Sequence, residues 1–133
     1  MIFVDTGAFL GRYLPDDQYH ADSLAGWKYL AEGLLPCCTS NLVISETITL
    51  LARRTNYAFA AEKARIIHAS TVLRILRPTA QDEIAAIPWL EKFADQRVSF
   101  TDAVSFALMK RHRLTRAFTF DRHFVLAGFK GLR

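Results

Sequence analysis

Residues 2–7 read IFVDTG, and this short segment contains the start of a strand-helix unit. Its apolar run is typical of a buried strand, and Asp5 ends that run. Thr6 and Gly7 then turn the chain into a short helix that we expect to end near Pro15. A strand that leads directly into a helix is the repeating unit from which parallel sheets covered by helices are built.

The rest of the chain continues this alternation. Segments with apolar residues at helical spacing alternate with short apolar runs. Helices are expected at about 20–34, 40–54, 57–69, from 79 onward and at 101–113, and strands at 37–39, 72–77 and 117–121. Thr79 is expected to open one helix, and Pro88 predicts a kink or a break within it. Thr101 is expected to cap the next helix, and Asp121 to end the last strand.

This alternation indicates an α/β fold with a mostly parallel central sheet covered by helices. The chain has no internal repeat, no low-complexity tract and no linker long enough to divide it. At 133 residues it is long enough to bury about two thirds of the surface that the unfolded chain exposes. We therefore expect residues 1–133 to form one domain.

Composition limits the cellular setting. Hydrophobic residues make up 51% of the chain, but no apolar run reaches the roughly 18 residues that a membrane-spanning helix needs. Met1 leads directly into the first strand without a basic segment or a cleavage site, so we expect no secretory signal, no membrane partner and a cytoplasmic protein. Cys37 and Cys38 are adjacent, which suits neither a disulfide framework nor a zinc site and predicts reduced, packed thiols.

Four acids stand out because of where the pattern places them: Asp5, Glu46, Asp102 and Asp121. Asp5 and Asp121 are expected to end strands, and ligand sites of open parallel sheets lie at the carboxyl ends of strands. Glu46 lies among apolar residues of its helix, and Asp102 lies in the first turn of another. Because buried carboxylates are costly unless they are paired, protonated or bound to metal, these acids predict an oxygen-ligand site for a divalent cation.

Each acid also has a purely structural interpretation. Glu46 could form a buried ion pair with Arg53, seven residues further along the helix. Asp102 could serve only to stabilise the start of its helix, and Asp121 could be the turn residue of Phe-Asp-Arg-His. Their joint arrangement is therefore stronger evidence than any one acid.

The remaining charge is basic. Setting the four site acids aside leaves 9 acidic residues against 17 Lys and Arg. A basic exterior around a local acidic spot suits a protein that grips phosphates beside a metal, and a merely basic surface is the alternative. The candidate phosphate contacts closest in sequence to the acids are Arg53, Arg54, Arg116 and Arg122. Of the histidines, only His123 adjoins an expected site acid.

Four motifs carry a family resemblance: Ile-Phe-Val-Asp-Thr at 2–6, Val-Ile-Ser-Glu-Thr at 43–47, Ser-Phe-Thr-Asp-Ala at 99–103 and Thr-Phe-Asp-Arg-His-Phe at 119–124. They span nearly the whole chain, which resembles a PIN-domain ribonuclease and, more closely, a toxin of the VapC type. The resemblance implies a three-layer α/β/α sandwich that hydrolyses RNA phosphodiester bonds with Mg²⁺ or Mn²⁺. It also implies a homodimer and a small antitoxin protein that blocks the site.

The resemblance further implies that the four acids form a catalytic quartet, with Thr6 and Thr101 in the places of supporting hydroxyls. We expect Asp5 and Asp102 to hold the principal metal, Asp121 to be a third ligand and Glu46 to orient the attacking water. The expected substrate is tRNA or another structured RNA. Because neighbouring carboxylates repel one another, some of their pKa values should be raised without metal.

Other functions remain open. The alternatives are a noncatalytic RNA-binding protein of the same fold, favoured if one acid lies outside the cluster, and a housekeeping RNA-processing nuclease. A phosphotransfer enzyme with Asp5 as nucleophile is disfavoured, because no second acid follows closely and no phosphate-binding glycine-rich loop is present. The basic, apolar helix pair expected at about 42–69 could bind an antitoxin helix or form a dimer face.

Overall fold

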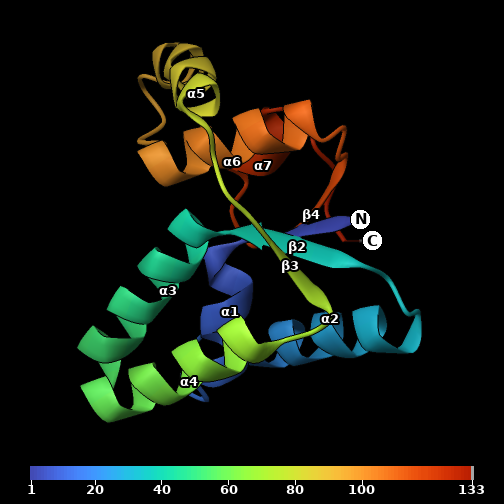
Figure 1. Ribbon diagram of the computed structural model, residues 1–133, viewed down its shortest axis with the longest axis vertical. Coiled ribbons are helices and arrows are strands. Elements are labelled where there is room, and N and C mark those ends of the chain that lie inside the picture. Colours follow the sequence, from blue (N-terminus) through green and yellow to red (C-terminus); the bar gives the residue numbers. More distant parts are fainter. Residues whose placement is uncertain (133) are drawn as a thin grey trace.

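Four short parallel strands form the central sheet of the computed structural model, which describes residues 1–132 (Figure 1). The strands are β1 (Ile2–Val4), β2 (Cys37–Ser40), β3 (Leu73–Leu76) and β4 (Arg116–Phe118). Their spatial order is β3-β2-β1-β4, and each neighbouring pair is parallel. β1 is therefore an interior strand, with Phe3 in register with both Cys38 and Ala117.

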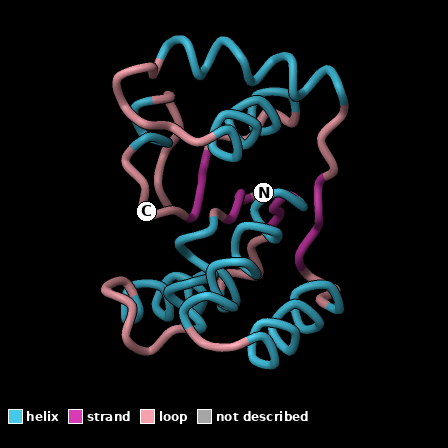
Figure 2. The backbone as a smooth tube through the Cα atoms, turned by 90° about the vertical axis from the view of Figure 1, so that its left-hand side faces the viewer, coloured by secondary structure: helices cyan, strands magenta, loops and turns pink. Residues whose placement is uncertain are grey.

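Helices cover both faces of the sheet, which confirms the three-layer α/β/α sandwich (Figures 1 and 2). One layer contains α1 (Thr6–Tyr13), α2 (His20–Glu32), α3 (Asn41–Arg54) and α4 (Tyr57–Ala69). The other contains α5 (Ala80–Lys92), α6 (Phe100–Arg111) and α7 (His123–Leu126). Among the helices of residues 1–132, none combines the length and the apolar character that a membrane crossing requires.

Side-chain caps fix where two of the expected helices begin. Ser40 accepts a hydrogen bond from the Val43 N–H at the start of α3, and Thr79 opens α5 in a capping box with Asp82. α5 continues past Pro88, so the expected break does not occur. Pro88 is exposed, and solvent can therefore hydrogen-bond the carbonyl group that a proline leaves without its helical partner.

Two boundaries near the acids differ from expectation. Ser99, not Thr101, is the N-cap of α6, and Asp102 completes a capping box by accepting a hydrogen bond from the Ser99 N–H. β4 ends three residues before Asp121, because the Asp121 N–H bonds the Thr119 hydroxyl in a turn instead of a neighbouring strand. Both acids are thus turn or cap residues, and Asp121 does not end a strand.

Buried aromatic residues fix the elements that carry the acids. Phe3 of β1, Phe106 of α6 and Phe124 of α7 are fully buried, and the Phe106 ring meets that of Phe124 edge-on with centroids 5.0 Å apart. Every residue from Ala103 to Met109 is buried in α6. This packing holds the first turns of α6 and α7 in place relative to β1.

The strand order creates a topological switch point between β1 and β4. From β1 the chain proceeds outward through β2 to β3, and it then returns to the other side of β1 as β4. Ligand sites of open parallel sheets lie at such points, outside the carboxyl ends of the strands. Asp5 directly follows β1 and Asp121 lies in the turn after β4, so two of the selected acids flank the switch point.

Candidate active site

The four selected acids come from four different elements and meet at the switch point. Asp5 links β1 to α1, Glu46 lies in α3, Asp102 lies in α6 and Asp121 follows β4. Burial is the largest cause of the raised pKa of Asp5, and the charges of Asp102 and Asp121 raise it further. Burial is also the largest cause of the raised pKa of Asp102, and there the charges of Asp121 and Glu46 raise it further. Each of the four carboxylates is thus close enough to at least two of the others for their charges to repel.

Asp5 is the most buried of these acids, with 5% of its surface exposed. Burial raises its pKa from 3.8 to about 7, and the neighbouring Asp102 charge acts in the same direction. The Thr6 backbone N–H and the Thr119 hydroxyl oppose this rise by hydrogen-bonding the carboxylate. In the absence of a cation, Asp5 therefore retains its proton to a much higher pH than an exposed carboxyl group does.

Asp102 and Glu46 show the same effect. Burial, followed by the Asp121 charge, raises the pKa of Asp102 to about 6. Burial also raises the pKa of Glu46, and the Thr101 side chain opposes that rise. Within residues 1–132 Glu46 forms no ion pair with Arg53, so the structural interpretation of Glu46 is wrong.

Thr119 joins two of the acids and was not among the residues selected from the sequence. Its hydroxyl donates a hydrogen bond to Asp5 Oδ2 at 2.9 Å and accepts one from the Asp121 backbone N–H at 3.0 Å. A single side chain therefore bridges the carboxyl ends of β1 and β4. The signal was present in the sequence, because Thr119 precedes Asp121 by two residues, the spacing at which a Ser or Thr hydroxyl bonds a following backbone N–H in a turn.

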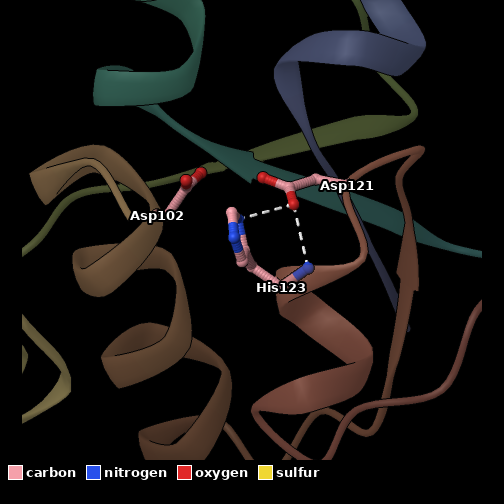
Figure 3. Close-up of side chains that lie close together, drawn as sticks. All are labelled: Asp102, Asp121 and His123. Atoms are coloured by element: carbon pink, nitrogen blue, oxygen red, sulfur yellow. Dashed lines mark hydrogen bonds and ion pairs between the residues drawn. The ribbon is translucent and has the colours of Figure 1, made fainter. Parts of the chain in front are cut away.

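Asp102, Asp121 and His123 form a group of potential metal ligands (Figure 3). One ligand atom of each residue lies within 4.8 Å of those of the other two. Asp121 Oδ1 lies 2.7 Å from His123 Nδ1 and also accepts the His123 backbone N–H at 2.8 Å. Asp5 and Glu46 lie outside this group, which thus contains two of the three expected metal ligands and adds a histidine.

The two threonines expected to support the site adjoin different acids. Thr6 follows Asp5 at the start of α1 and is 7% exposed, and its Oγ1 has no hydrogen-bond partner among the described residues. Thr101 lies in the first turn of α6 next to Glu46, whose pKa is raised mainly by burial and lowered in part by the Thr101 side chain. Each threonine thus lies beside one carboxylate.

Two of the arginines expected to contact RNA lie away from the acids. Arg53 and Arg54 are exposed in the last turn of α3, whereas Glu46 lies near the start of that helix. The Arg54 guanidinium pairs with Asp17 at 3.1 Å. Figure 1 shows that α3 extends away from the sheet, so its last turn lies away from the strand ends that form the switch point.

Arg116 and Arg122 differ in their relation to the site. Arg116 begins β4, at the opposite end of that strand from Asp121, and its guanidinium donates a hydrogen bond to the Leu132 carbonyl. Arg122 directly follows Asp121, is exposed and donates to Gln96 Oε1 at 3.2 Å. Of the arginines selected from the sequence, Arg122 is therefore the one beside the carboxylates.

A divalent cation fits this set of donors. Burial and mutual repulsion raise the pKa values of Asp5 and Asp102, and a cation held between carboxylates removes that repulsion. Thr6 Oγ1 and both ring nitrogens of His123 are buried without hydrogen-bond partners within residues 1–132, which is expected of atoms that face an ion or its waters. A donor set dominated by carboxylate oxygens suits Mg²⁺ or Mn²⁺.

Known proteins resemble this chain over its whole length. Residues 2–130 match the family model of the PIN domain. The chain is 38% identical over 133 residues to the 23S rRNA-specific endonuclease VapC20 of Mycobacterium tuberculosis, in strains H37Rv and CDC 1551, and the match covers 100% of this chain and 98% of that protein.

The similarity extends to solved structures. The crystal structure of Mycobacterium tuberculosis VapC20, named a sarcin-ricin loop cleaving toxin, gives a TM-score of 0.87 at 36% identity and covers 97% of this chain and 96% of that one. The structure of FitAcB from Neisseria gonorrhoeae gives a TM-score of 0.71 at 18% identity over 100% of this chain and 97% of the other, which supports the fold alone.

Proposed function

This chain belongs to the PIN-domain family, and we propose that it is a metal-dependent endoribonuclease, the toxin of a toxin-antitoxin pair. Its catalytic residues would be Asp5, Glu46, Asp102 and Asp121, with Mg²⁺ or Mn²⁺ as cofactor. The observation that carries this proposal is the meeting of four carboxylates at the β1–β4 switch point, where burial and neighbouring charge raise the pKa of Asp5 to about 7. Such a group is costly to bury unless it binds a cation.

The residues divide the work as follows. Asp5, Asp102 and Asp121 would hold the cation, which would supply an activated water and offset charge on the scissile phosphate. Thr119 fixes the orientation of the Asp5 carboxylate through the 2.9 Å hydrogen bond. Glu46, whose pKa is raised by burial, is suited to accept a proton from the attacking water.

The family resemblance implied tRNA or another structured RNA, and of these we propose 23S rRNA, cut in the sarcin-ricin loop, as the substrate. VapC20 supports this choice, because its name assigns it to 23S rRNA and it is 38% identical to this chain over 133 residues. The TM-score of 0.87 with the VapC20 structure supports the same substrate. Arg122 is exposed beside Asp121 and can contact an RNA phosphate.

Incubation of ribosomes, free 23S rRNA and total tRNA with the purified protein and Mn²⁺ tests the proposal, and primer extension maps each cut. We expect one cut in the sarcin-ricin loop that is abolished by EDTA and by Asp5→Asn. Asp95→Asn is the matched control, because Asp95 is exposed and lies outside the acid group. Cuts in tRNA alone would show that tRNA, and not rRNA, is the substrate. RNA binding without any cut would favour the noncatalytic alternative.

We also propose that the protein acts in the cytoplasm, that residues 1–133 are one domain, and that a homodimer binds an antitoxin. An apolar groove of about 970 Å³ between α2 and α4, at the end of the sheet opposite the acids, supports a protein partner. Leu34 and Val72 line it and are 88% and 81% exposed. Inhibition of cleavage by a small protein encoded next to this one would distinguish a toxin from a housekeeping nuclease.

A further inference from the structure

We propose that the imidazole of His123 is a ligand of the metal, so that the site combines oxygen and nitrogen donors and prefers Mn²⁺ to Mg²⁺. This role rests on the metal dependence proposed above. His123 is the first residue of α7, a helix that carries none of the four acids.

The position of the ring is the first reason. Figure 3 shows the His123 side chain extending from the start of α7 into the space between Asp102 and Asp121. Its Nδ1 lies 2.7 Å from Asp121 Oδ1, and one ligand atom each of Asp102, Asp121 and His123 fit within 4.8 Å of one another. Adjacent ligands on an octahedral ion with bonds of about 2.1 Å lie about 3 Å apart. The nitrogen and the oxygen are therefore already close to the spacing of two ligands of one ion.

The second reason is that the ring nitrogens have no other partner. Only 15% of the His123 side chain is exposed, and both nitrogens are buried without a hydrogen bond to any residue of the described chain. The short contact with Asp121 Oδ1 does not have the direction of a hydrogen bond. Buried polar atoms are nearly always satisfied, and one that is not requires an explanation such as an ion. Coordination of a cation through one nitrogen supplies it.

The ring is also held in this position. The His123 backbone N–H donates to Asp121 Oδ1 at 2.8 Å, which fixes the start of α7 against the acid. The next residue, Phe124, is fully buried and packs against Phe106 of α6 and Phe3 of β1. A ligand on a rigid support loses little freedom when it binds metal, so this arrangement favours coordination.

The imidazole nitrogen determines which ion the site binds more tightly. Mg²⁺ prefers oxygen ligands and retains its waters, whereas first-row transition ions gain affinity from imidazole. An imidazole donor from His123 therefore favours Mn²⁺. The other histidines do not compete for this role, because His20 bonds the Gly11 carbonyl at 2.7 Å, and His68 and His112 lie at the ends of α4 and α6, away from the acids.

Pulsed electron paramagnetic resonance of the protein loaded with Mn²⁺ tests this role without measuring activity. We expect a ¹⁴N coupling typical of directly bound imidazole, which disappears in His123→Asn and persists in His112→Asn. His112 caps the far end of α6 and provides a matched control. Titrations followed through the free Mn²⁺ signal should show a roughly tenfold weaker affinity of His123→Asn for Mn²⁺, and competition should show a smaller loss for Mg²⁺.

The possible outcomes separate this role from the proposed function. Bound Mn²⁺ without a nitrogen coupling in the wild-type protein would overturn the ligand role of His123 and leave the four-acid nuclease unaffected. No binding of Mn²⁺ by the wild-type protein would overturn both. Because the wild-type spectrum decides the first question, the test does not depend on whether His123→Asn folds.

Discussion

The Thr119 hydroxyl donates a hydrogen bond to Asp5 Oδ2 at 2.9 Å and thereby joins the ends of the first and last strands, which lie 114 residues apart in sequence. The same hydroxyl accepts the Asp121 backbone N–H at 3.0 Å. The most buried acid of the site is therefore held by the side chain that directly follows β4, and that bond opposes the rise of the Asp5 pKa to about 7, whose largest cause is burial.

Thr119→Val removes this hydroxyl and keeps the shape of the side chain. Because the hydrogen bond favours ionised Asp5, its loss should raise the pKa of Asp5 in the metal-free protein. At subsaturating metal, the acid limb of the pH-rate profile should then move to higher pH, because metal binding has to displace the Asp5 proton. The cleavage rate at pH 7 should fall roughly two- to tenfold, the range that a net hydrogen bond of about 0.5–1.5 kcal/mol allows. Thr119→Ser should retain the wild-type profile. Identical profiles for Thr119→Val and wild type would contradict this role of the bond.

The raised pKa of Asp5 also predicts how stability depends on pH in the absence of metal. The folded protein holds the Asp5 proton more tightly than the unfolded chain, so this contribution to stability is complete below about pH 4 and is lost as pH rises through about 7. Asp5→Asn removes the charge, so the variant does not lose this contribution as pH rises. The unfolding free energy of the variant minus that of the wild type should therefore be larger at pH 8 than at pH 4, by at most about 4 kcal/mol. Urea denaturation in EDTA measures this difference, and parallel curves for the two proteins would refute it.

Metal binding should stabilise the folded protein. A cation relieves the repulsion among Asp5, Asp102 and Asp121, and at a hundredfold excess over its Kd a ligand stabilises by about 2.7 kcal/mol. For a chain of this size we expect Mn²⁺ to raise Tm by roughly 10 °C and to release protons. Asp102→Asn should lose most of this shift, whereas Asp95→Asn should keep it. An equal shift in both variants would place the ion elsewhere.

The arginines should differ in their effect on RNA binding. Arg122 lies beside Asp121, so Arg122→Ala should raise KM several-fold with little change in kcat. The slope of log affinity against log salt concentration should fall by about 1, the value for one lost phosphate contact. Arg53→Ala, at the far end of α3, should leave both quantities close to wild type. Cleavage kinetics at several salt concentrations compare the two variants. A larger KM effect for Arg53→Ala would show that the RNA follows α3 instead.

Gly26 of α2 packs against β4 so closely that a methyl group does not fit. A Cβ there would lie 2.4 Å from the Phe118 ring, and the buried ring is confined by Trp27 at 5.4 Å between centroids. Gly→Ala within a helix normally stabilises by about 1 kcal/mol, but overpacking costs about 1–3 kcal/mol. Gly26→Ala should therefore lower the unfolding free energy.

Gly7→Ala is the matched control for this substitution in urea denaturation. Gly7 also lies in a helix, α1, and a Cβ there would lie 3.6 Å from the Phe120 ring, which is an ordinary contact. We expect Gly7→Ala to be neutral or stabilising. A stabilised Gly26→Ala protein would show that Phe118 can move aside.

The sequence predicted most of the fold because apolar periodicity reflects burial directly. The family resemblance and the three-layer sandwich were confirmed. The start of α6 was misplaced because Ser99 and Thr101 are both good caps, and local sequence does not show which one the packing of the helix selects. The end of β4 was misplaced because a side-chain hydrogen bond, that of Thr119, competes with strand pairing at Asp121.

The four acids could be selected from sequence because a carboxylate in an apolar context is costly, and the structure brings them together. The basic residues lack such a constraint. Arg116 is five residues from Asp121 in sequence but lies at the opposite end of β4, where it bonds the Leu132 carbonyl. Distance along a strand separates residues in space, and sequence proximity was therefore a poor guide.

The pairing of β1 with β4 has a consequence for protein synthesis. β1 is the first strand to leave the ribosome, but it has no partner on one side until residues 116–118 have been translated. Asp121 and His123 follow even later. Contacts between distant parts of a chain must first overcome the entropy of closing the loop between them, which slows their formation. The proposed site therefore cannot assemble on a nascent chain before residues 116–123 have left the ribosome.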